Sequence, residues 1–516
     1  MDTSYNLSKI NKKTFFFKHD KINENQKLIN RSSALFLVKH SIKRKVFTDL
    51  HLLNYWSIKG KIKKVKAKIT LRRLNGKKLK SKAIYIDQIN AYCLELKKFF
   101  AELKIDEFIG VVEIEIFSKK NLFFPYPAIY VRYHGVNWHT GTHSTTRYFS
   151  RTSGDDPELI KRHQAVNESN ITLFSEKDLK CYVVLHNGLI KSTNTEISLI
   201  ATNIHGKTIK KKINPLIMKI GETLIICVDD YLNYKNFLKN KRGMLSVNYE
   251  NTGVFPRLLY FHENSDGQIT LEHSNFGNSK QASKDSFKPK KSTRNLLYSI
   301  PILSKNYKTE IDFFPTYPIQ KSPYSIICKK NTIDGKNLTN KKIKISKKSP
   351  FCQLTEKGLK KTTFLDIDIV NKAKLPNRFH VSQYYSRKNS LPGIILDGPV
   401  PINTKAPRTR WLPFFNEGRN LKSKIYICSR YYHPINLNKK IKLSLMLIGG
   451  LKNEKIKIEK EIKENENLEL DISKILKGKK WKSNYGWMYI TFNEPCHNTV
   501  FFSSEYKRSI IFNHAF

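Results

Sequence analysis

The chain has 516 residues, enough for roughly three to four domains of ordinary size, which excludes a minimal single module. Hydrophobic residues make up 40% of it and aromatic residues 12%, so several cores can be filled and wholesale disorder is excluded. Lysine and arginine number 93 against 43 acidic residues, which gives a formal net charge of +50.

This charge predicts attraction to polyanions at low salt, whether nucleic acid, anionic lipid or acidic glycan, but not specificity among them. Codon bias is an alternative source of the charge, because the chain is rich in Lys, Asn and Ile. The basic runs either alternate with apolar core residues or lie in predicted linkers. No zinc-finger, helix-turn-helix or RNP-type motif appears. We therefore expect non-specific nucleic-acid binding at low salt.

The seven cysteines are scattered and form no C-x-x-C pair, which disfavours a zinc ribbon, a redox dithiol and a disulfide scaffold. The first residues, MDTSYNLSKINKKTFFFKHDK, lack the apolar run of a signal peptide. No uncharged apolar run of about 18 residues predicts a transmembrane helix. We expect a cytoplasmic protein with reduced thiols.

Short β-branched and aromatic runs with a period of two dominate across the chain. Residues 61–71 (KIKKVKAKITL) and 110–117 (GVVEIEIF) alternate apolar and charged side chains, which predicts antiparallel sheets with one face in water. Helical segments are brief, and the clearest is residues 91–103, where Cys93, Leu96 and Phe99 recur at helical spacing.

The order of these runs repeats. Similar strand sequences centre on Leu96, Val228, Ile367 and Leu470, which lie roughly 100–140 residues apart. A repeat of about 100 residues with several short strands is the size of an antiparallel β-sandwich. The sequence therefore predicts a mainly β protein of about four tandem antiparallel β-sandwich-like modules with short helical segments.

Shifts in composition suggest the boundaries. We divide the chain into a polar N-terminal extension (1–33), a first module (34–149), a linker (150–178), a second module (179–277), a linker (278–294), a third module with a proline-rich excursion (295–420) and a fourth module (421–516).

One segment, residues 133–156 (YHGVNWHTGTHSTTRYFSRTSGDD), carries an unusual concentration of histidines. Imidazole and carboxylate are suitable ligands for a divalent metal, and His134, His139, His143 and Asp155 form our candidate metal site. The spacing matches no established metal signature. The alternative is that these are turn and strand-end histidines held by hydrogen bonds.

A polar residue recurs near the end of each repeat. His262 and His273 follow the last strand of the second repeat, His514 closes the fourth, and Arg408 and Arg410 lie near the corresponding place in the third. This recurrence favours a structural role in anchoring a returning strand, and it equally permits a glycan or anion pocket used more than once.

Two clusters combine arginine with tryptophan, a pairing suited to anions and sugars. The first contains Trp138, Arg147 and Arg151. The second contains Arg408, Arg410 and Trp411, with Asp397 and Glu417 as candidate carboxylate partners.

No P-loop, dinucleotide fingerprint, nucleophile elbow or H-E-x-x-H motif appears. We therefore expect a non-enzymatic binding or scaffolding protein for an acidic polymer or glycan, with no cofactor assigned beyond the candidate divalent metal. The alternatives are a metal-dependent enzyme acting on a carbohydrate or other polar substrate, and a basic protein associated with nucleic acid.

Overall fold

The computed structural model describes residues 29–515, apart from a set of internal segments. The omitted segments are residues 121, 123–126, 144–145, 149–167, 189–191, 193–194, 240, 251–252, 278–295, 316–323, 347–350, 371–378, 387–390, 398–408, 418–420, 431–439, 453, 464, 494–496 and 508. The predicted linker 278–294 and most of the extension 1–33 lie outside the described residues. Strand β9 (Glu168–Leu173) lies within the segment 150–178 that we assigned to a linker.

The prediction of a mainly β protein with short helical segments is confirmed. The helices are α2 (Tyr55–Lys59), α3 (Leu96–Leu103), the 3-10 helix η2 (Val228–Asp230), α5 (Tyr234–Leu238) and α7 (Ile472–Leu476). In three of the four repeats a helix directly follows the strand at the equivalent place, as α3 follows β5 (Ala91–Glu95). None of the helices in the described residues has the length and apolar character needed to cross a membrane.

The strands form eight sheets, which we group into four pairs, each with an outer and an inner sheet. The first outer sheet has the order β1 (Ile29–Ser41), β6 (Glu107–Ser118), β3 (Val65–Arg73), β4 (Lys78–Tyr85). The first inner sheet has the order β5 (Ala91–Glu95), β2 (Phe47–Leu53), β7 (Ala128–His134), β8 (His139–His143).

The second pair keeps this arrangement and adds one strand. Its outer sheet is β12 (Thr208–Leu216), β11 (Thr195–Thr202), β14 (Gly243–Asn248), β9 (Glu168–Leu173), β17 (Asn275–Gly277). Its inner sheet is β13 (Thr223–Cys227), β10 (Lys180–His186), β15 (Leu259–Glu263), β16 (Ile269–His273).

The third and fourth pairs follow the same order. The third outer sheet is β18 (Leu296–Ile302), β23 (Thr363–Val370), β20 (Tyr324–Asn331), β21 (Asn337–Ile345), and its inner sheet is β22 (Cys352–Lys357), β19 (Lys308–Pro315), β24 (Phe379–Ser386), β25 (Gly393–Asp397). The fourth outer sheet is β26 (Thr409–Phe415), β31 (Tyr485–Phe492), β28 (Lys440–Gly449), β29 (Lys455–Lys463), and its inner sheet is β30 (Asn467–Asp471), β27 (Leu421–Arg430), β32 (His497–Tyr506), β33 (Ser509–His514).

The chain passes repeatedly between the two sheets of a pair instead of completing one sheet at a time. In the first pair it visits the outer sheet with β1, the inner with β2, the outer with β3 and β4, the inner with β5, the outer with β6, and the inner with β7 and β8. The same sequence of visits recurs in the other three pairs, and neighbouring strands in each sheet are antiparallel.

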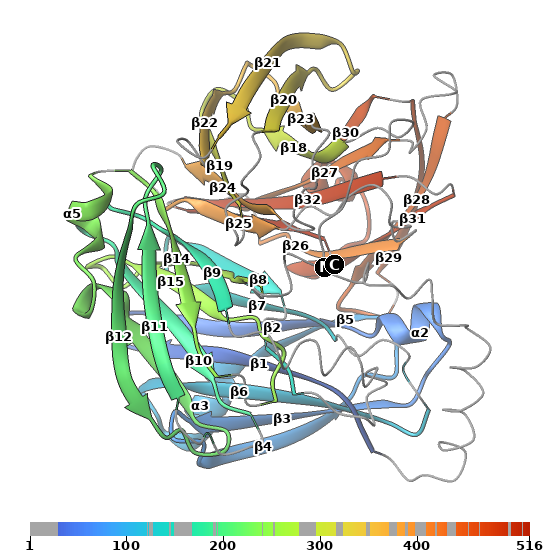
Figure 1. The fold of residues 1–516 in the computed structure, drawn as a ribbon. Helices are drawn as coiled ribbons and strands as arrows, with labels where there is room; N and C mark the ends of the chain where they lie inside the picture. The colour runs from blue at the N-terminus through green and yellow to red at the C-terminus, as the bar shows by residue number, and fades with distance from the viewer. Residues whose placement is uncertain are drawn as a thin grey trace, which may run out of the picture.

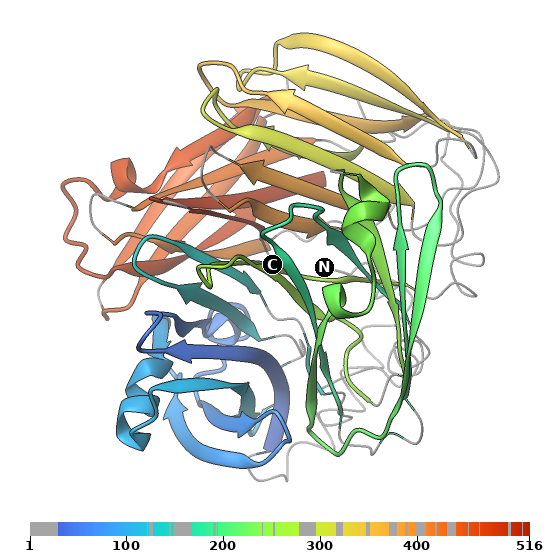
Figure 2. The same ribbon diagram turned by 90° about the vertical axis from the view of Figure 1, so that its left-hand side faces the viewer.

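The eight sheets are arranged around a common centre like the blades of a propeller (Figures 1 and 2). The last strands of the inner sheets, β8, β16, β25 and β33, contact one another in cyclic order, so the fourth pair returns to the first. Figure 2 shows the chain running around this centre from blue through green and yellow to red. The prediction of tandem β-sandwich modules is therefore wrong: the sheets close into one eight-bladed, propeller-like ring.

Burial explains why separate modules do not form. The outer strands behave as predicted, with buried positions alternating with more exposed ones along β3 and β28. The closing strands β8, β16 and β33 are instead buried at every position, because their second face packs against the next inner sheet. One apolar core consequently continues from the first pair into the second and fourth, and Tyr55 stacks on Trp411 with ring centroids 4.8 Å apart.

The shared core predicts a large stability cost when Phe415 is replaced by alanine. Phe415 lies at the end of β26 and is 1% exposed, and its ring lies 5.0 Å from the His51 ring in the first pair. Phe415→Ala should lower the free energy of unfolding by about 3–5 kcal/mol in urea denaturation. Tyr85→Ala, at a 66% exposed aromatic residue, is the control and should change it by no more than about 0.5 kcal/mol. Equal effects of the two substitutions would contradict a core shared between pairs.

Candidate functional site

Four strands close the inner sheets, and three of them converge on one buried carboxylate. Glu272 in β16 is 0% exposed. Its Oε1 accepts a hydrogen bond from Thr142 Oγ1 of β8 at 2.7 Å, and its Oε2 accepts one from Asn513 Nδ2 of β33 at 2.9 Å. Oε1 also accepts from the backbone N–H of His273 at 2.8 Å. These bonds satisfy a buried charge and join β8, β16 and β33 at one point.

The fourth closing strand, β25, is attached through backbone contacts. Thr270 Oγ1 of β16 donates to the carbonyl of Pro392 at 2.6 Å, just before β25 begins. Leu391 forms an isolated parallel bridge with Ser509 of β33. A Cβ atom at Gly393 would lie 2.7 Å from the Ile510 carbonyl oxygen, so glycine is required where β25 and β33 approach.

Three histidines end three of the closing strands and lie together. His143 ends β8, His273 ends β16 and His514 ends β33, and they are 2%, 1% and 7% exposed. One ring nitrogen from each lies within 4.8 Å of the others. The His143 ring meets the His273 ring edge-on at 4.4 Å and the His514 ring edge-on at 4.7 Å between centroids. We call His143, His273 and His514 the histidine cluster.

Backbone oxygens define the tautomers of two cluster members. Nδ1 of His273 lies 3.2 Å from the carbonyl oxygen of Ser274, and Nδ1 of His514 lies 3.1 Å from that of Ala515. Because a carbonyl oxygen only accepts, both Nδ1 atoms carry the proton and both Nε2 atoms carry the lone pair. Nδ1 of His143 lies 3.3 Å from Asn513 Oδ1, which favours the same tautomer.

Burial and a neighbouring positive charge oppose the protonation of two members of the cluster. Burial, together with His514 and Arg257, lowers the pKa of His143 well below its ordinary value of 6.5. Burial and then Arg257 lower the pKa of His273 in the same way. Nη1 of Arg257 lies 3.4 Å from Nε2 of His143, so this guanidinium borders the cluster and opposes protonation.

Among the described residues, His134 and His139 of the predicted metal site do not join His143 in one group of ligand atoms. His134 Nε2 contacts Asp49 Oδ2 at 2.8 Å, and His139 Nε2 contacts the Ser504 carbonyl oxygen at 2.8 Å. Of the predicted set, His143 belongs to the histidine cluster, and Asp155 lies outside the described residues. The partners of His143 are His273 and His514, which the sequence had marked only as recurring residues at the ends of repeats.

The two predicted arginine–tryptophan clusters form no common exposed pocket in the described residues. Trp138 and Trp411 are each 4% exposed and belong to the shared apolar core. Arg147 is 2% exposed, and its guanidinium lies over the Phe255 ring at 5.5 Å. Arg410 is partly buried in β26. Arg151 and Arg408 lie outside the described residues.

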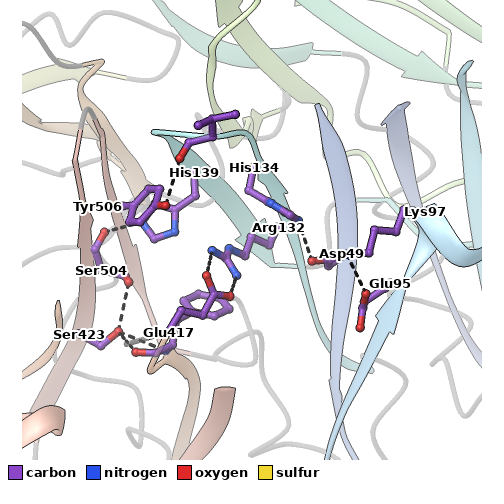
Figure 3. Close-up of polar contacts among 12 residues, drawn as sticks. Asp49, Glu95, Lys97, Arg132, His134, His139, Glu417, Ser423, Ser504 and Tyr506 are labelled. Atoms are coloured by element: carbon purple, nitrogen blue, oxygen red, sulfur yellow. Dashed lines mark hydrogen bonds and ion pairs between the residues drawn. The ribbon is translucent and has the colours of Figure 1, made fainter. Parts of the chain in front are cut away.

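A second polar cluster joins the first pair of sheets to the fourth (Figure 3). Arg132 in β7 is 3% exposed and binds Glu417 in a bidentate ion pair, with Nη1 donating to Oε1 and Nη2 donating to Oε2 at 2.9 Å. Burial opposes the charge on Arg132, but the ion pair raises the pKa of Arg132 above its ordinary value. Burial would raise the pKa of Glu417, but Arg132 holds it below the ordinary value.

Beside this ion pair, Asp49, His51 and Cys93 also bring ligand-type atoms within 4.8 Å of one another. Burial strongly raises the pKa of the Cys93 thiol, so the thiolate that a metal needs is disfavoured. Burial would also raise the pKa of Asp49, but the hydrogen bond to His134 holds it below its ordinary value. This group therefore suits metal binding less well than the histidine cluster.

Sequence reasoning missed Glu272 and Arg132, although each leaves a signal. Both are single charged residues inside otherwise apolar strands, ITLEH and AIYVRYH. A charge in a strand buried on both faces needs a specific partner, which makes such a residue a marker of a buried polar network. Glu417, predicted to partner Arg408 and Arg410, instead binds Arg132.

Comparison with known proteins identifies no family. No protein-family model matches the chain, and no curated protein matches it. Solved structures similar to parts of it include the BSP domain of a biofilm associated protein, with 8% identity, coverage of 95% of this chain and 97% of that chain, and a TM-score of 0.17. A viral chemokine binding protein encoded by rodent gammaherpesvirus Peru has 6% identity, coverage of 68% and 84%, and a TM-score of 0.13.

A third similar structure is the β-glucuronidase of Bacteroides uniformis, with 8% identity, coverage of 54% of this chain and 27% of that chain, and a TM-score of 0.11. TM-scores this low do not constrain either the fold or the function of the chain. Function must therefore be inferred from its own residues.

Loss of the carboxylate should cost more stability in the buried Arg132–Glu417 ion pair than in the exposed Lys80–Glu102 ion pair. Glu417→Gln leaves the buried Arg132 without a counter-charge and should lower the free energy of unfolding by about 2–3 kcal/mol, somewhat less than for a fully buried pair because the Glu417 side chain is 36% exposed. Glu102→Gln, which removes the surface partner of Lys80, should leave stability unchanged. Urea denaturation of both variants measures the difference, and a stable Glu417→Gln protein would refute the role assigned to the pair.

Buried histidines predict a loss of stability in mild acid. Burial lowers the pKa of His51 and His186 to about 4 and that of His262 to about 3, whereas each titrates near 6.5 when unfolded. Below pH 6.5 the unfolded chain binds protons that the folded chain excludes, so stability falls by about 1 kcal/mol per histidine per pH unit as the pH drops toward 4.

Denaturation at stepped pH values between 7 and 4.5 tests this dependence. His262→Gln should reduce the steepness of the decline by about one bound proton. A free energy of unfolding that stays constant between pH 6.5 and 5 would show that these histidines are not excluded from protonation in the folded protein.

Proposed function

We propose that the protein is a non-enzymatic binding scaffold for an acidic glycan polymer, which it contacts through the lysine-rich edges of its outer sheets. The observation that carries this proposal is the position of the lysines. Each outer sheet has one of the strands β4, β12, β21 and β29 at an edge, and each of these strands holds at least three lysines. Figure 1 places β21, β12 and β4 at the periphery.

Strand β21 supports the proposal best. Residues 337–342 are all exposed, and this edge strand holds Lys342 and Lys344 on one face and Lys341 on the other. Within the described residues these three lysines form no ion pair with a carboxylate of the chain. An edge strand also offers backbone N–H groups along its free side, which suit the carboxylate, sulfate and hydroxyl groups of an acidic glycan.

The other edges are partly neutralised. In β29, Lys457 pairs with Glu459 at 2.8 Å, and Glu461 contacts Lys440 of the neighbouring strand at 3.2 Å. In β12, Lys212 pairs with Glu196 at 2.8 Å. The strength of polyanion binding should therefore differ among the four edges, with β21 the strongest.

Lysines at sheet edges also prevent edge-to-edge aggregation, and that role alone needs no ligand. The two roles differ in what charge removal does: loss of an aggregation barrier lowers solubility, whereas loss of a binding surface lowers affinity. The metal-dependent enzyme alternative draws no support from the histidine cluster, because side chains at most 7% exposed leave no open position for a substrate.

We also propose that the protein is located in the cytoplasm. The described cysteines, Cys93, Cys181, Cys227, Cys328, Cys352 and Cys428, are free thiols. Free and largely buried thiols suit a reducing compartment.

Binding to heparin and to polygalacturonate, measured by fluorescence anisotropy across salt, tests the proposal. Affinity for both should fall by roughly tenfold or more between 50 and 200 mM NaCl. The triple variant Lys341→Ser/Lys342→Ser/Lys344→Ser should lose about tenfold in affinity at 50 mM salt.

The matched control is Lys455→Ser/Lys457→Ser/Lys460→Ser in β29, which removes the same charge from an edge that holds Glu459 and Glu461. It should lose less than about threefold. Equal losses in both triple variants would show that net charge alone drives binding. A preference for DNA of equal charge over both glycans would favour the nucleic-acid alternative instead.

A further inference from the structure

The histidine cluster has the composition of a metal site and is built by the fold alone. His143 and His273 are 130 residues apart in the chain and His514 lies near its end, yet the three closing strands bring their ring nitrogens within 4.8 Å. Three histidines at the ends of three strands are a frequent zinc donor set. Zinc–nitrogen bonds of about 2.0–2.1 Å place tetrahedral donors about 3.3 Å apart, so ring nitrogens that lie up to 4.8 Å apart must draw together when a metal binds.

The hydrogen bonds on the far side of the rings match those of metal-binding histidines. A metal ligand usually donates its second ring N–H to a carbonyl or carboxylate, which orients the imidazole. Nδ1 of His273 and of His514 face the Ser274 and Ala515 carbonyl oxygens, and Nδ1 of His143 faces the side-chain oxygen of Asn513. His273 and His514 thus present Nε2 on the side of the ring away from these oxygens, whereas Nε2 of His143 contacts Nη1 of Arg257 at 3.4 Å.

The buried lone pair of His273 is the observation that points to a ligand. This residue is 1% exposed, and its Nε2 has no hydrogen-bond partner within the described residues; Glu272 Oε1, at 3.4 Å, can only accept. Leaving a polar atom in this state costs about 1–3 kcal/mol. A cation at the centre of the cluster would satisfy this nitrogen.

We propose that His143, His273 and His514 bind one divalent first-row transition metal, best matched by zinc, which locks the closing strands of the ring together. The buried carboxylate of Glu272, hydrogen-bonded to Thr142 and Asn513 from the neighbouring strands, supplies negative charge beside the cation.

One neighbour opposes the metal and sets its affinity. Arg257 Nη1 lies 3.4 Å from His143 Nε2 and must move aside when that nitrogen binds a cation. The guanidinium also lies over the Phe255 ring, at 5.7 Å, and this ring gives it an alternative contact. Arg257→Gln should therefore tighten metal binding by about tenfold, the reverse of what removal of a ligand does.

The first test is the metal content of the full-length protein purified without chelator. Elemental analysis should find one equivalent of zinc per chain in the wild type and less than about a tenth of an equivalent in His273→Gln. The matched control is His262→Gln, since His262 is equally buried in β15, the strand paired with β16, but lies outside the cluster. It should retain the full equivalent.

The second test needs no variant and remains informative if His273→Gln fails to fold. Wild-type protein stripped with a chelator is titrated with Co²⁺ and then with Zn²⁺, while visible absorption and thermal unfolding are followed. The expected result is the absorption of four-coordinate Co²⁺, its loss on addition of Zn²⁺, and a higher Tm with either metal. The proposal would be overturned if the purified wild type contained no metal and the stripped protein also gave no Co²⁺ spectrum on titration.

The proposal does not depend on glycan binding. Polyanion affinity is carried by β21 at the periphery, so Lys341→Ser/Lys342→Ser/Lys344→Ser should leave the metal content at one equivalent per chain. Loss of metal in that variant would contradict the separation of the two sites.

Discussion

The closure of the ring depends on the hydrogen bonds to the buried carboxylate of Glu272. This carboxylate accepts hydrogen bonds from Thr142, from Asn513 and from the backbone of its own strand, so three closing strands are held at one buried point. A charge with 0% exposure is tolerated only when its acceptors are satisfied, and the donors come from segments far apart in the chain. The ring therefore closes only when all three strands are in place, and the histidine cluster is a consequence of that closure.

The same constraint accounts for the difference between the inner and outer sheets. The outer sheets keep one face in water and carry the lysines, whereas the closing strands β8, β16 and β33 are buried at every position. Because each inner sheet packs on two neighbours, its core cannot be separated from the next, and Phe415 and Arg132 join the fourth pair to the first. Lysines at the periphery and buried charges with specific partners at the centre follow from one architecture.

The sequence predicts the outer sheets better than the inner ones. Alternation in residues 61–71 identifies β3. The helical prediction for residues 91–103 is correct only from Leu96, where α3 begins, because Ala91–Glu95 form the inner strand β5. The repeat alignment places Ile367 with Leu96 and Leu470, but Ile367 lies in β23, which takes the place of β6. The third repeat is thus aligned one strand too late, because its β22 (CQLTEK) lacks the apolar pattern of β5 and is followed by no helix in the described residues. Strands buried on both faces lack the alternation of apolar and polar residues that identifies a strand in a sequence. The contacts among His143, His273 and His514 depend on closure of the ring, and no local sequence pattern encodes that closure.

The closed ring also determines when the molecule can fold. His139 of β8 and Ser509 of β33 share a hydrogen bond although 370 residues separate them. During synthesis, β33 leaves the ribosome long after β8. Until then β8 exposes an edge that is fully buried in the finished protein, and such an edge can pair with other chains. Assembly of the centre is therefore a long-range step that waits for β33, and the edge of β8 stays without its final neighbour until then.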